Sequence, residues 1–327
     1  MPIPESATVA AAFRDDLSIL AQEYRVLKAA ARFIGMRAAP IFRVAETAGE
    51  YPTFNRDSFK KTATSKRAAN GSYNRITGTF GRATYNTEEY GLEYTIDDKT
   101  AKKYVRFFSA EQVANRVLNY QMLKNHEERV SALYAGGGWT NTNVTTAWTT
   151  VATATPIGDI QTGVDTLMDK TGAAENDISI IIPRADWKEL NLVDQFTEKY
   201  SSTFSRNQGI QPGLVRAADA AEIFGVKEVI IANSAKDTTE ENVAETNSQI
   251  WAAGVIYICI LADGEGAPLE EMSAARTIVW DAETPGMPTM EAYREENLRR
   301  GIVRAREETD EILQGATDLF VYQLTNT

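Results

Sequence analysis

The side chains best suited to chemistry lie in the stretch MLKNHEERVSALYAGGG, residues 122–138. This stretch contains His126, the only histidine of the chain, followed directly by Glu127, Glu128 and Arg129. An imidazole titrates near neutral pH and binds metals, and a neighbouring carboxylate can assist either task. The composition of the stretch therefore raises two possibilities, the acid and base of an enzyme or a metal site.

The element that carries these residues separates them in space. A helix is expected from Ser109, which starts the capping-box pattern SAEQ, to about Tyr134, where three consecutive glycines end it. Successive helical residues are rotated by about 100°, so Glu127 and Glu128 point about 100° and 200° away from His126. These side chains therefore cannot meet on one ion. We expect His126 to pack and the three residues after it to point in different directions around the helix.

The apolar side of this helix changes along its length. Val113, Val117 and Tyr120 share one face of the helical wheel, whereas Leu123 and the apolar residues after it share another face with His126. A long helix with such a shift is expected to pack on different elements at its two ends.

Other chemical motifs are absent from the sequence. It has no phosphate-binding loop of the pattern GxxxxGK[ST], no GxSxG nucleophile elbow and no calcium loop. The single cysteine, Cys259, lies in the apolar run IYICIL, so neither an intramolecular disulfide nor a cysteine metal site can form. Nothing selects a catalytic pair among the 45 acidic residues. We predict no catalytic, metal-binding or cofactor-binding residues, and no cofactor.

The totals describe a folded protein with an uneven charge distribution. Hydrophobic residues make up 43% of the 327-residue chain and charged residues 24%. No segment reaches the roughly 18 apolar residues of a membrane span, and the N-terminus lacks an export signal, so we expect no membrane association. The net charge is −11, but residues 1–108 carry +5 and residues 109–327 carry −16. Such an acidic body is unsuited to coating nucleic acid.

The positive charge is concentrated in residues 56–82. From Tyr51 to Ile96 the chain is rich in Thr, Asn, Arg, Lys and Tyr, and its few aliphatic residues cannot form a core. The pair Asn70-Gly71 favours a tight hairpin turn, and apolar alternation at the end of the region predicts a strand. We therefore predict a long basic β-hairpin that projects from the body. Its cations, opposed by a single aspartate, are Arg56, Lys60, Lys61, Lys66, Arg67, Arg75 and Arg82.

The remaining segments indicate mixed helices and strands. Residues 9–34 have helix-forming composition with an amphipathic stripe, which favours either a core helix or an arm that covers its stripe on another surface. Residues 157–280 predict a compact α/β unit, with strands ISIII, EVIIA, VIYICIL and RTIVW and with helices ended by Gly172 and Gly225. After residue 290, a run of arginines and acids is typical of a solvated face, and LFVYQL predicts a strand that returns to the body.

The order of these elements resembles the major capsid protein of tailed bacteriophages, which has the Hong Kong 97 coat-protein fold. The resemblance covers nearly the whole chain. It is carried by GEYPTFNRDSF and KRAANGSYNR in the hairpin, EYGLEYTIDD before the long helix, and AAEIFGVKEVIIANSA and SQIWAAGVIYICIL in the α/β unit. None of these is a catalytic motif, so the resemblance rests on order and composition.

The resemblance implies an α+β fold with five parts. They are the N-terminal arm (1–36), the extended β-hairpin loop with flanking strands (37–108), the spine helix of the peripheral domain with a connection (109–156), the α/β axial domain (157–288) and the returning strands of the peripheral domain (289–327). It also implies that the extended loop lies across a neighbouring subunit. The seven cations named above are therefore expected to contact the acidic body of the next copy.

The resemblance further implies a structural subunit and not an enzyme. Copies would self-assemble into hexamers and pentamers of an icosahedral virion capsid, formed in the bacterial host cytoplasm. This shell would enclose double-stranded DNA without sequence-specific binding, with a portal protein and a decoration protein as further partners. Because the arm begins within about ten residues of Met1, a separate scaffolding protein is expected instead of a fused scaffolding segment.

Two alternatives stay open at this point. An encapsulin-like compartment shell shares the fold and would need an inner docking site for a cargo peptide. Neighbouring genes for a portal and a terminase, or for a cargo enzyme, would separate these two kinds of shell. A carboxylate-based enzyme in the α/β unit is the more distant alternative.

Overall fold

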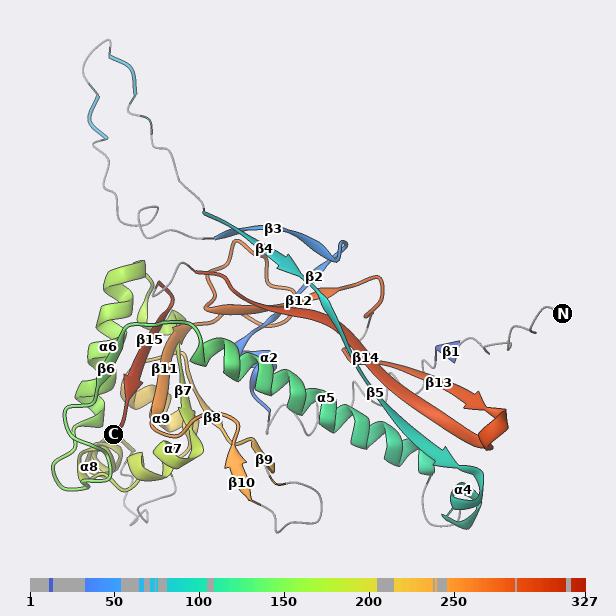
Figure 1. Cartoon of the computed structure of the whole chain (residues 1–327). Coiled ribbons are helices and arrows are strands. Elements are labelled where there is room, and N and C mark those ends of the chain that lie inside the picture. The colour runs from blue at the N-terminus through green and yellow to red at the C-terminus, as the bar shows by residue number, and fades with distance from the viewer. Residues whose placement is uncertain are drawn as a thin grey trace.

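One long helix joins the two larger β-sheets of the computed structural model (Figure 1). The described residues are 12–13, 33–53, 65–67, 71–73, 75, 81–104, 109–204, 215–237, 239, 246–285, 287–315 and 319–327. Helix α5 (Ala110–Ala135) contacts strands β5 (Glu88–Asp97) and β14 (Arg300–Leu313) of the six-stranded sheet. Its last turns enter the apolar core of the five-stranded sheet through Val130 and Tyr134.

The six-stranded sheet is organised around β14. One edge of β14 pairs antiparallel with β5 over residues 300–309. The other edge pairs with β13 (Thr289–Glu295) and then with β12 (Ala275–Trp280), which in turn pairs in parallel with β2 (Ile41–Val44). Residues of β14 alternate between buried and partly exposed from Val303 to Thr309, and α5 packs on the buried face.

Helix α5 begins and ends where its sequence predicts. The Ser109 hydroxyl oxygen accepts a hydrogen bond from the Gln112 amide, 3.5 Å away, and Gly136 caps the last turn. The predicted change of packing partner along the helix is also confirmed. The first part packs on β5, β13 and β14, and the last turns pack on the α/β unit.

The first half of α5 buries a different face from the predicted one. Val117 is 40% exposed, whereas Leu118 and Met122 are buried against Val303 and Ala305 of β14. The prediction considered large apolar residues alone, but small and amide side chains also allow a helix to approach a sheet. Those on the buried face are Ala114, Asn115 and Asn119.

The five-stranded sheet forms an α/β unit with a continuous apolar core. Its strands lie in the order β6 (Asn141–Asn143), β15 (Val321–Thr325), β11 (Val255–Ile260), β7 (Ile178–Pro183) and β8 (Glu228–Ala232). Strand β11 is central and largely buried, as predicted. The accompanying helices are α6 (Pro156–Thr171), α7 (Arg184–Leu190), α8 (Asp194–Phe204) and α9 (Ala217–Phe224). Gly172 and Gly225 end α6 and α9 with φ angles of 74° and 69°, which glycine adopts without steric cost.

Two strands lie in the opposite sheet from the one predicted. The prediction that RTIVW belongs to the α/β unit is wrong, because these residues form β12 and pair with β14 and β2. The prediction that the C-terminal strand joins the charged returning strands is also wrong, because β15 pairs with β11. Hydrophobic patterning identifies a buried strand but does not choose between two sheets that both offer apolar faces.

The helix predicted over residues 9–34 is wrong at described positions. Ala12–Phe13 form a short strand, β1, which pairs antiparallel with β13, and the short helix α2 begins only at Gly35 and ends at Ala38. An unpaired sheet edge offers backbone hydrogen bonds that can outweigh a weak helix propensity. Residues 9–11 and 14–32 lie outside the described part of the chain.

The described structure also contains two smaller ribbons and one short helix. Strands β3 (Ala48–Thr53) and β4 (Gly81–Asn86) pair antiparallel, as do β9 (Ala235–Asp237) and β10 (Asn247–Gln249). Helix α4 (Asp98–Tyr104) follows β5 directly. No helix among the described residues combines the length and apolarity needed to cross a bilayer.

Candidate functional site

The predicted basic hairpin has an antiparallel root, formed by β3 and β4, that is fixed to the six-stranded sheet. Tyr51 of β3 is buried against Ile278 and Ile312, and its hydroxyl donates to the Leu313 carbonyl oxygen, 3.0 Å away. Beyond this root, the described loop residues 65–67 and 71–73 lie well away from both sheets (Figure 1). The sheet thus holds the two ends of a segment whose described residues contact solvent.

Four of the seven predicted contact residues are described, and all four are exposed. Arg82 lies 3.5 Å from Glu50 across the root, but both side chains are mostly exposed, so this ion pair contributes little stability. The described cations are therefore not part of the core of their own chain. They are Lys66, Arg67, Arg75 and Arg82, whereas Arg56, Lys60 and Lys61 lie outside the described residues.

An aromatic side chain accompanies these cations near the predicted turn. Tyr73 is 74% exposed, and the Arg67 guanidinium lies over its ring, 4.7 Å from the centroid. Arg67 Nε also donates to the Gly71 carbonyl oxygen at 2.5 Å, although Asn70 of the predicted turn lies outside the described residues. Tyrosine and arginine often dominate binding energy at protein interfaces, and sequence reasoning based on charge overlooked Tyr73.

His126 is buried at the joint between α5 and the six-stranded sheet, which confirms its predicted packing role. Its Nε2 atom lies 3.0 Å from Thr277 Oγ1 of β12. The Thr277 hydroxyl donates its hydrogen to the Ala39 carbonyl oxygen at 3.1 Å, so Nε2 must carry a hydrogen to donate to Thr277. The imidazole therefore connects the long helix to β12.

The three residues after His126 point in different directions, as predicted, but Glu127 is fully buried. Its Oε2 atom accepts from the Gly35 amide at 2.7 Å, and its Oε1 atom accepts from Ser234 Oγ and Trp251 Nε1 at 2.7 and 2.8 Å. Burial raises the pKa of Glu127, and these hydrogen bonds oppose the rise. The carboxylate thereby joins α5 to α2 and to the α/β unit, which helical spacing alone does not reveal.

Arg129 pairs with the charged run of β14. Its Nη2 atom lies 2.8 Å from Glu307 Oε1, and its Nε atom lies 3.1 Å from both carboxylate oxygens of Glu311. The prediction of a solvated face is therefore wrong at these positions, because Glu307 is only 2% exposed. Glu128 points elsewhere and lies 3.5 Å from Lys236 of β9.

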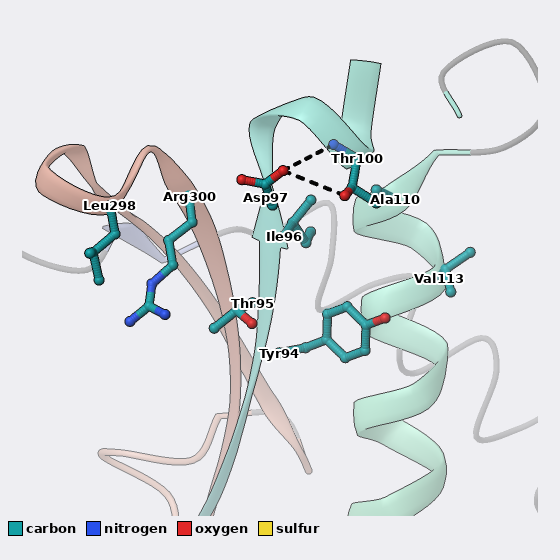
Figure 2. A pocket seen from close by; sticks show the side chains of 9 residues that line it. All are labelled: Tyr94, Thr95, Ile96, Asp97, Thr100, Ala110, Val113, Leu298 and Arg300. Carbon is teal, nitrogen blue, oxygen red and sulfur yellow. Dashed lines mark hydrogen bonds between the residues drawn. The ribbon is translucent and has the colours of Figure 1, made fainter. Parts of the chain in front are cut away.

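A groove of about 620 Å³ lies at the C-terminal end of β5, beside the first turn of α5 (Figure 2). Tyr94, Ile96, Val113 and Leu298 supply most of its apolar lining. Asp97 is the one carboxylate among its lining residues, and the described structure engages it in capping α4, where its Oδ2 atom accepts from the Thr100 amide and hydroxyl. This groove therefore lacks paired acids, and it lies outside the α/β unit in which the carboxylate-enzyme alternative places its site.

No three His, Cys, Asp or Glu side chains among the described residues are arranged to hold a metal ion. Cys259 is buried in β11, and burial raises the pKa of its thiol far above the usual range, which suppresses formation of the reactive thiolate. The distinctive surface of the described structure is thus the exposed basic hairpin on its anchored root.

Comparison with known proteins identifies the fold. No protein-family model and no curated protein sequence matches the chain. A crystal structure of a phage-related protein from Bordetella bronchiseptica RB50 is similar over 97% of this chain and 98% of its own, with a TM-score of 0.71 and 17% identity. The capsid structure of cyanophage P-SCSP1u is similar over 99% and 92%, with a TM-score of 0.59 and 11% identity.

A third similar structure comes from an archaeon. The virus-like particle from Pyrococcus furiosus matches over 94% of this chain and 95% of its own, with a TM-score of 0.53 and 8% identity. All three similarities extend over nearly the full length of both chains, and they agree with the resemblance found in the order of sequence elements. The chain therefore has the fold of phage capsid proteins, the Hong Kong 97-like fold.

Proposed function

We propose that the protein is the structural subunit of an icosahedral phage head and not an enzyme. Copies assemble into hexamers and pentamers, and the closed shell encloses the packaged double-stranded DNA. The observation that carries this proposal is the capsid fold over nearly the entire chain. The exposed, anchored basic hairpin supports it, because its described cations are available to contact a neighbouring copy.

The fold suggests which part of the chain plays which role in the shell. The α/β unit, within residues 157–288, is the axial domain that meets its copies around the ring axis, with β15 added to its sheet. Helix α5 and the six-stranded sheet are the peripheral domain, with β12 added to it. Residues 1–36 are the arm, and the segment between β3 and β4 is the extended loop.

The extended loop contacts the acidic body of the next copy in the ring. Residues 109–327 carry a net charge of −16, so a loop with seven cations is attracted to and oriented on this surface. Each copy gives one loop and receives one, and this head-to-tail contact closes rings. The contact residues are Arg56, Lys60, Lys61, Lys66, Arg67, Arg75 and Arg82.

Other partners follow from the same role. A separate scaffolding protein guides curvature, a portal occupies one vertex, and a decoration protein binds outside. An acidic lining suits DNA that must enter and leave, because it does not grip phosphates.

Electron microscopy of the purified full-length protein, alone and with a candidate scaffolding protein, tests the proposal. Rings, tubes or closed shells are the expected products. A persistent monomer under all conditions would contradict a shell subunit.

A compartment shell that encloses a cargo protein is the second candidate, because the virus-like particle from Pyrococcus furiosus has a similar fold. Particles purified from the native host distinguish the two. A phage head contains nuclease-protected DNA, whereas a compartment contains a co-purifying protein and no genome.

A further inference from the structure

Two buried carboxylates share one permanently charged partner where α5 crosses β14. Arg129 donates from Nη2 to Glu307 Oε1 at 2.8 Å and from Nε to Glu311 Oε1 and Oε2 at 3.1 Å. Both acids are almost fully buried, and Arg129 is largely buried with them. If both acids are ionised, this cluster carries one negative charge in excess inside the protein.

His126 is the other basic group beside the acids. Its Nε2 atom lies 3.7 Å from Glu311 Oε1, next to its contact with Thr277. Within the described part of the chain, Arg129 and His126 are the cationic or titratable bases that the structure places within ion-pair distance of these two acids. The cluster therefore becomes neutral when it takes up a single proton, on an acid or on the imidazole.

The remaining groups around the cluster do not supply a positive charge. From β5, the Tyr90 ring lies under the Arg129 guanidinium, 3.8 Å from it, and its hydroxyl donates to Glu88. From β14, Asp310 adds further negative charge near Glu311. From α5 itself, Glu127 turns to the opposite side, toward α2 and the α/β unit. The nearest arginines of β14, Arg304 and Arg306, pair instead with Glu93, Glu283 and Glu291.

We propose that the Arg129–Glu307–Glu311–His126 cluster is a proton-binding joint, which holds α5 on β14 most firmly when one proton is bound. An isolated buried charge costs several kcal/mol in a low-dielectric interior, so the joint either keeps the proton or loosens. The inference concerns the folded chain and does not depend on the proposed function in a shell.

Glu307 is the group that holds the proton below about pH 7. It is the more buried acid, and the described structure gives its carboxylate one donor, Arg129 Nη2. Burial also raises the pKa of Glu311, but its carboxylate has more donors opposing the rise: the Arg129 Nε hydrogen shared between its two oxygens, and Thr309 Oγ1 at 3.2 Å. Burial accordingly raises the pKa of Glu307 to about 7, against the lowering effect of Arg129.

The sign of the pH effect follows from this rise in pKa. The folded chain holds the proton up to about pH 7, whereas an unfolded glutamate releases it near its ordinary value of about 4.5. Between these values the folded state binds more protons than the unfolded state, so stability falls as the pH rises from about 5 to 7. Above that range the joint is at its weakest, and the contribution of Glu307 to the stability of the folded chain no longer changes with pH.

The variant Glu307→Gln tests the joint, because glutamine keeps the shape and hydrogen-bonding capacity without the charge. Glu89→Gln, at an exposed position on β5, is the matched control. The measurement is the urea midpoint of unfolding of the full-length protein at pH 5, 6, 7 and 8. Wild type and the control are expected to lose stability over this range, and Glu307→Gln should show a flatter profile and a higher midpoint than wild type at pH 8. Equal pH dependence in Glu307→Gln and wild type would overturn the proposal.

A second measurement keeps the test decisive if the variant folds poorly. Hydrogen exchange of wild-type protein, corrected for intrinsic rates, reports how firmly α5 is held. Peptides covering residues 122–134 should lose protection between pH 6 and pH 8, while peptides of the β11 core keep theirs. Unchanged relative protection of α5 would also overturn the proposal.

Discussion

The α/β unit and the six-stranded sheet with α5 differ in what fills the space between their elements. In the α/β unit, one continuous apolar cluster extends across β7, β11, β15 and the helices around them. In the other region, apolar contacts are divided among several small clusters, and charged or hydrogen-bonded side chains of α5 lie between them. Arg129 and its partners Glu307 and Glu311 therefore occupy buried space between α5 and β14 that apolar side chains fill in the α/β unit.

The difference indicates that the two regions differ in rigidity. A continuous apolar core resists deformation, because interiors are close-packed and each lost contact is felt. A region built from small clusters, paired strands and ionic contacts has fewer such constraints, and it also carries the exposed hairpin. We therefore expect the α/β unit to behave as a rigid block and the six-stranded sheet to be the more sensitive to pH and to neighbouring copies.

The largest expected effect comes from Arg129→Met, which leaves Glu307 and Glu311 buried without their cation. Removing one partner of a buried ion pair costs about 3–5 kcal/mol, because the remaining charge is uncompensated. Urea unfolding at pH 8 measures the loss. Arg304→Met is the control, since the pair of Arg304 with Glu93 is exposed and should contribute about 0–1 kcal/mol. Equal losses in the two variants would contradict the importance of the buried cluster.

Ile258→Ala tests the apolar block at its centre. The side chain is fully buried in β11, next to α6 and β15, so the substitution leaves a cavity and should cost about 2–4 kcal/mol at every pH. Ile258→Val should cost about 1 kcal/mol. A loss that changes strongly with pH would erase the proposed contrast between the two regions.

Trp251→Phe removes one of the donors to the buried Glu127 carboxylate while keeping most of the apolar ring. We expect a loss of about 1–2 kcal/mol, because a buried charge loses a hydrogen bond. Trp280→Phe is the matched control, since its indole donates to the Ala45 carbonyl in a more exposed position. Equal unfolding free energies of the two variants would show that the hydrogen bond from Trp251 to Glu127 does not help to hold α5 on the α/β unit.

The smallest effect on folding and the largest on assembly are expected in the hairpin. Reversing the charge at the four described cations should change the unfolding free energy by no more than about 0.5 kcal/mol, because these side chains do not belong to the core. Assembly measured by sedimentation should be lost. Exchanging Lys and Arg at the same positions preserves charge and should preserve assembly. The positions are Lys66, Arg67, Arg75 and Arg82.

Tyr73→Ser extends the same test to the aromatic side chain beside Arg67. It should leave folding unchanged and weaken assembly, since the contact area of the ring is lost. Normal assembly of this variant would limit the role of the hairpin to its charge.

Much of the fold could be predicted from local patterns. The capping box at Ser109 and the glycine-terminated helices α6 and α9 were predictable because these signals act within a few residues. The pairing partners of β12 and β15 could not be predicted, because strand pairing is decided by the whole chain and both sheets accept an apolar strand. The prediction of the buried face in the first half of α5 was wrong for a related reason, since burial there follows the shape of the facing sheet.

The candidate site divides in the same way. The exposed cations of the hairpin followed from composition, because a segment without aliphatic residues cannot bury them. The buried roles of Glu127 and Glu307 could not be predicted from composition. A charged residue is ordinarily solvated and becomes buried only when distant elements supply partners. Arg129 and Glu307 are 178 residues apart, so no local pattern connects them.

Cryo-electron microscopy of particles assembled from the full-length protein tests the central claim most directly. We expect a closed shell of five- and six-membered rings, in which each basic hairpin lies across the acidic body of the next copy. A map in which the protein stays monomeric, or in which the hairpin contacts only its own chain, would contradict it.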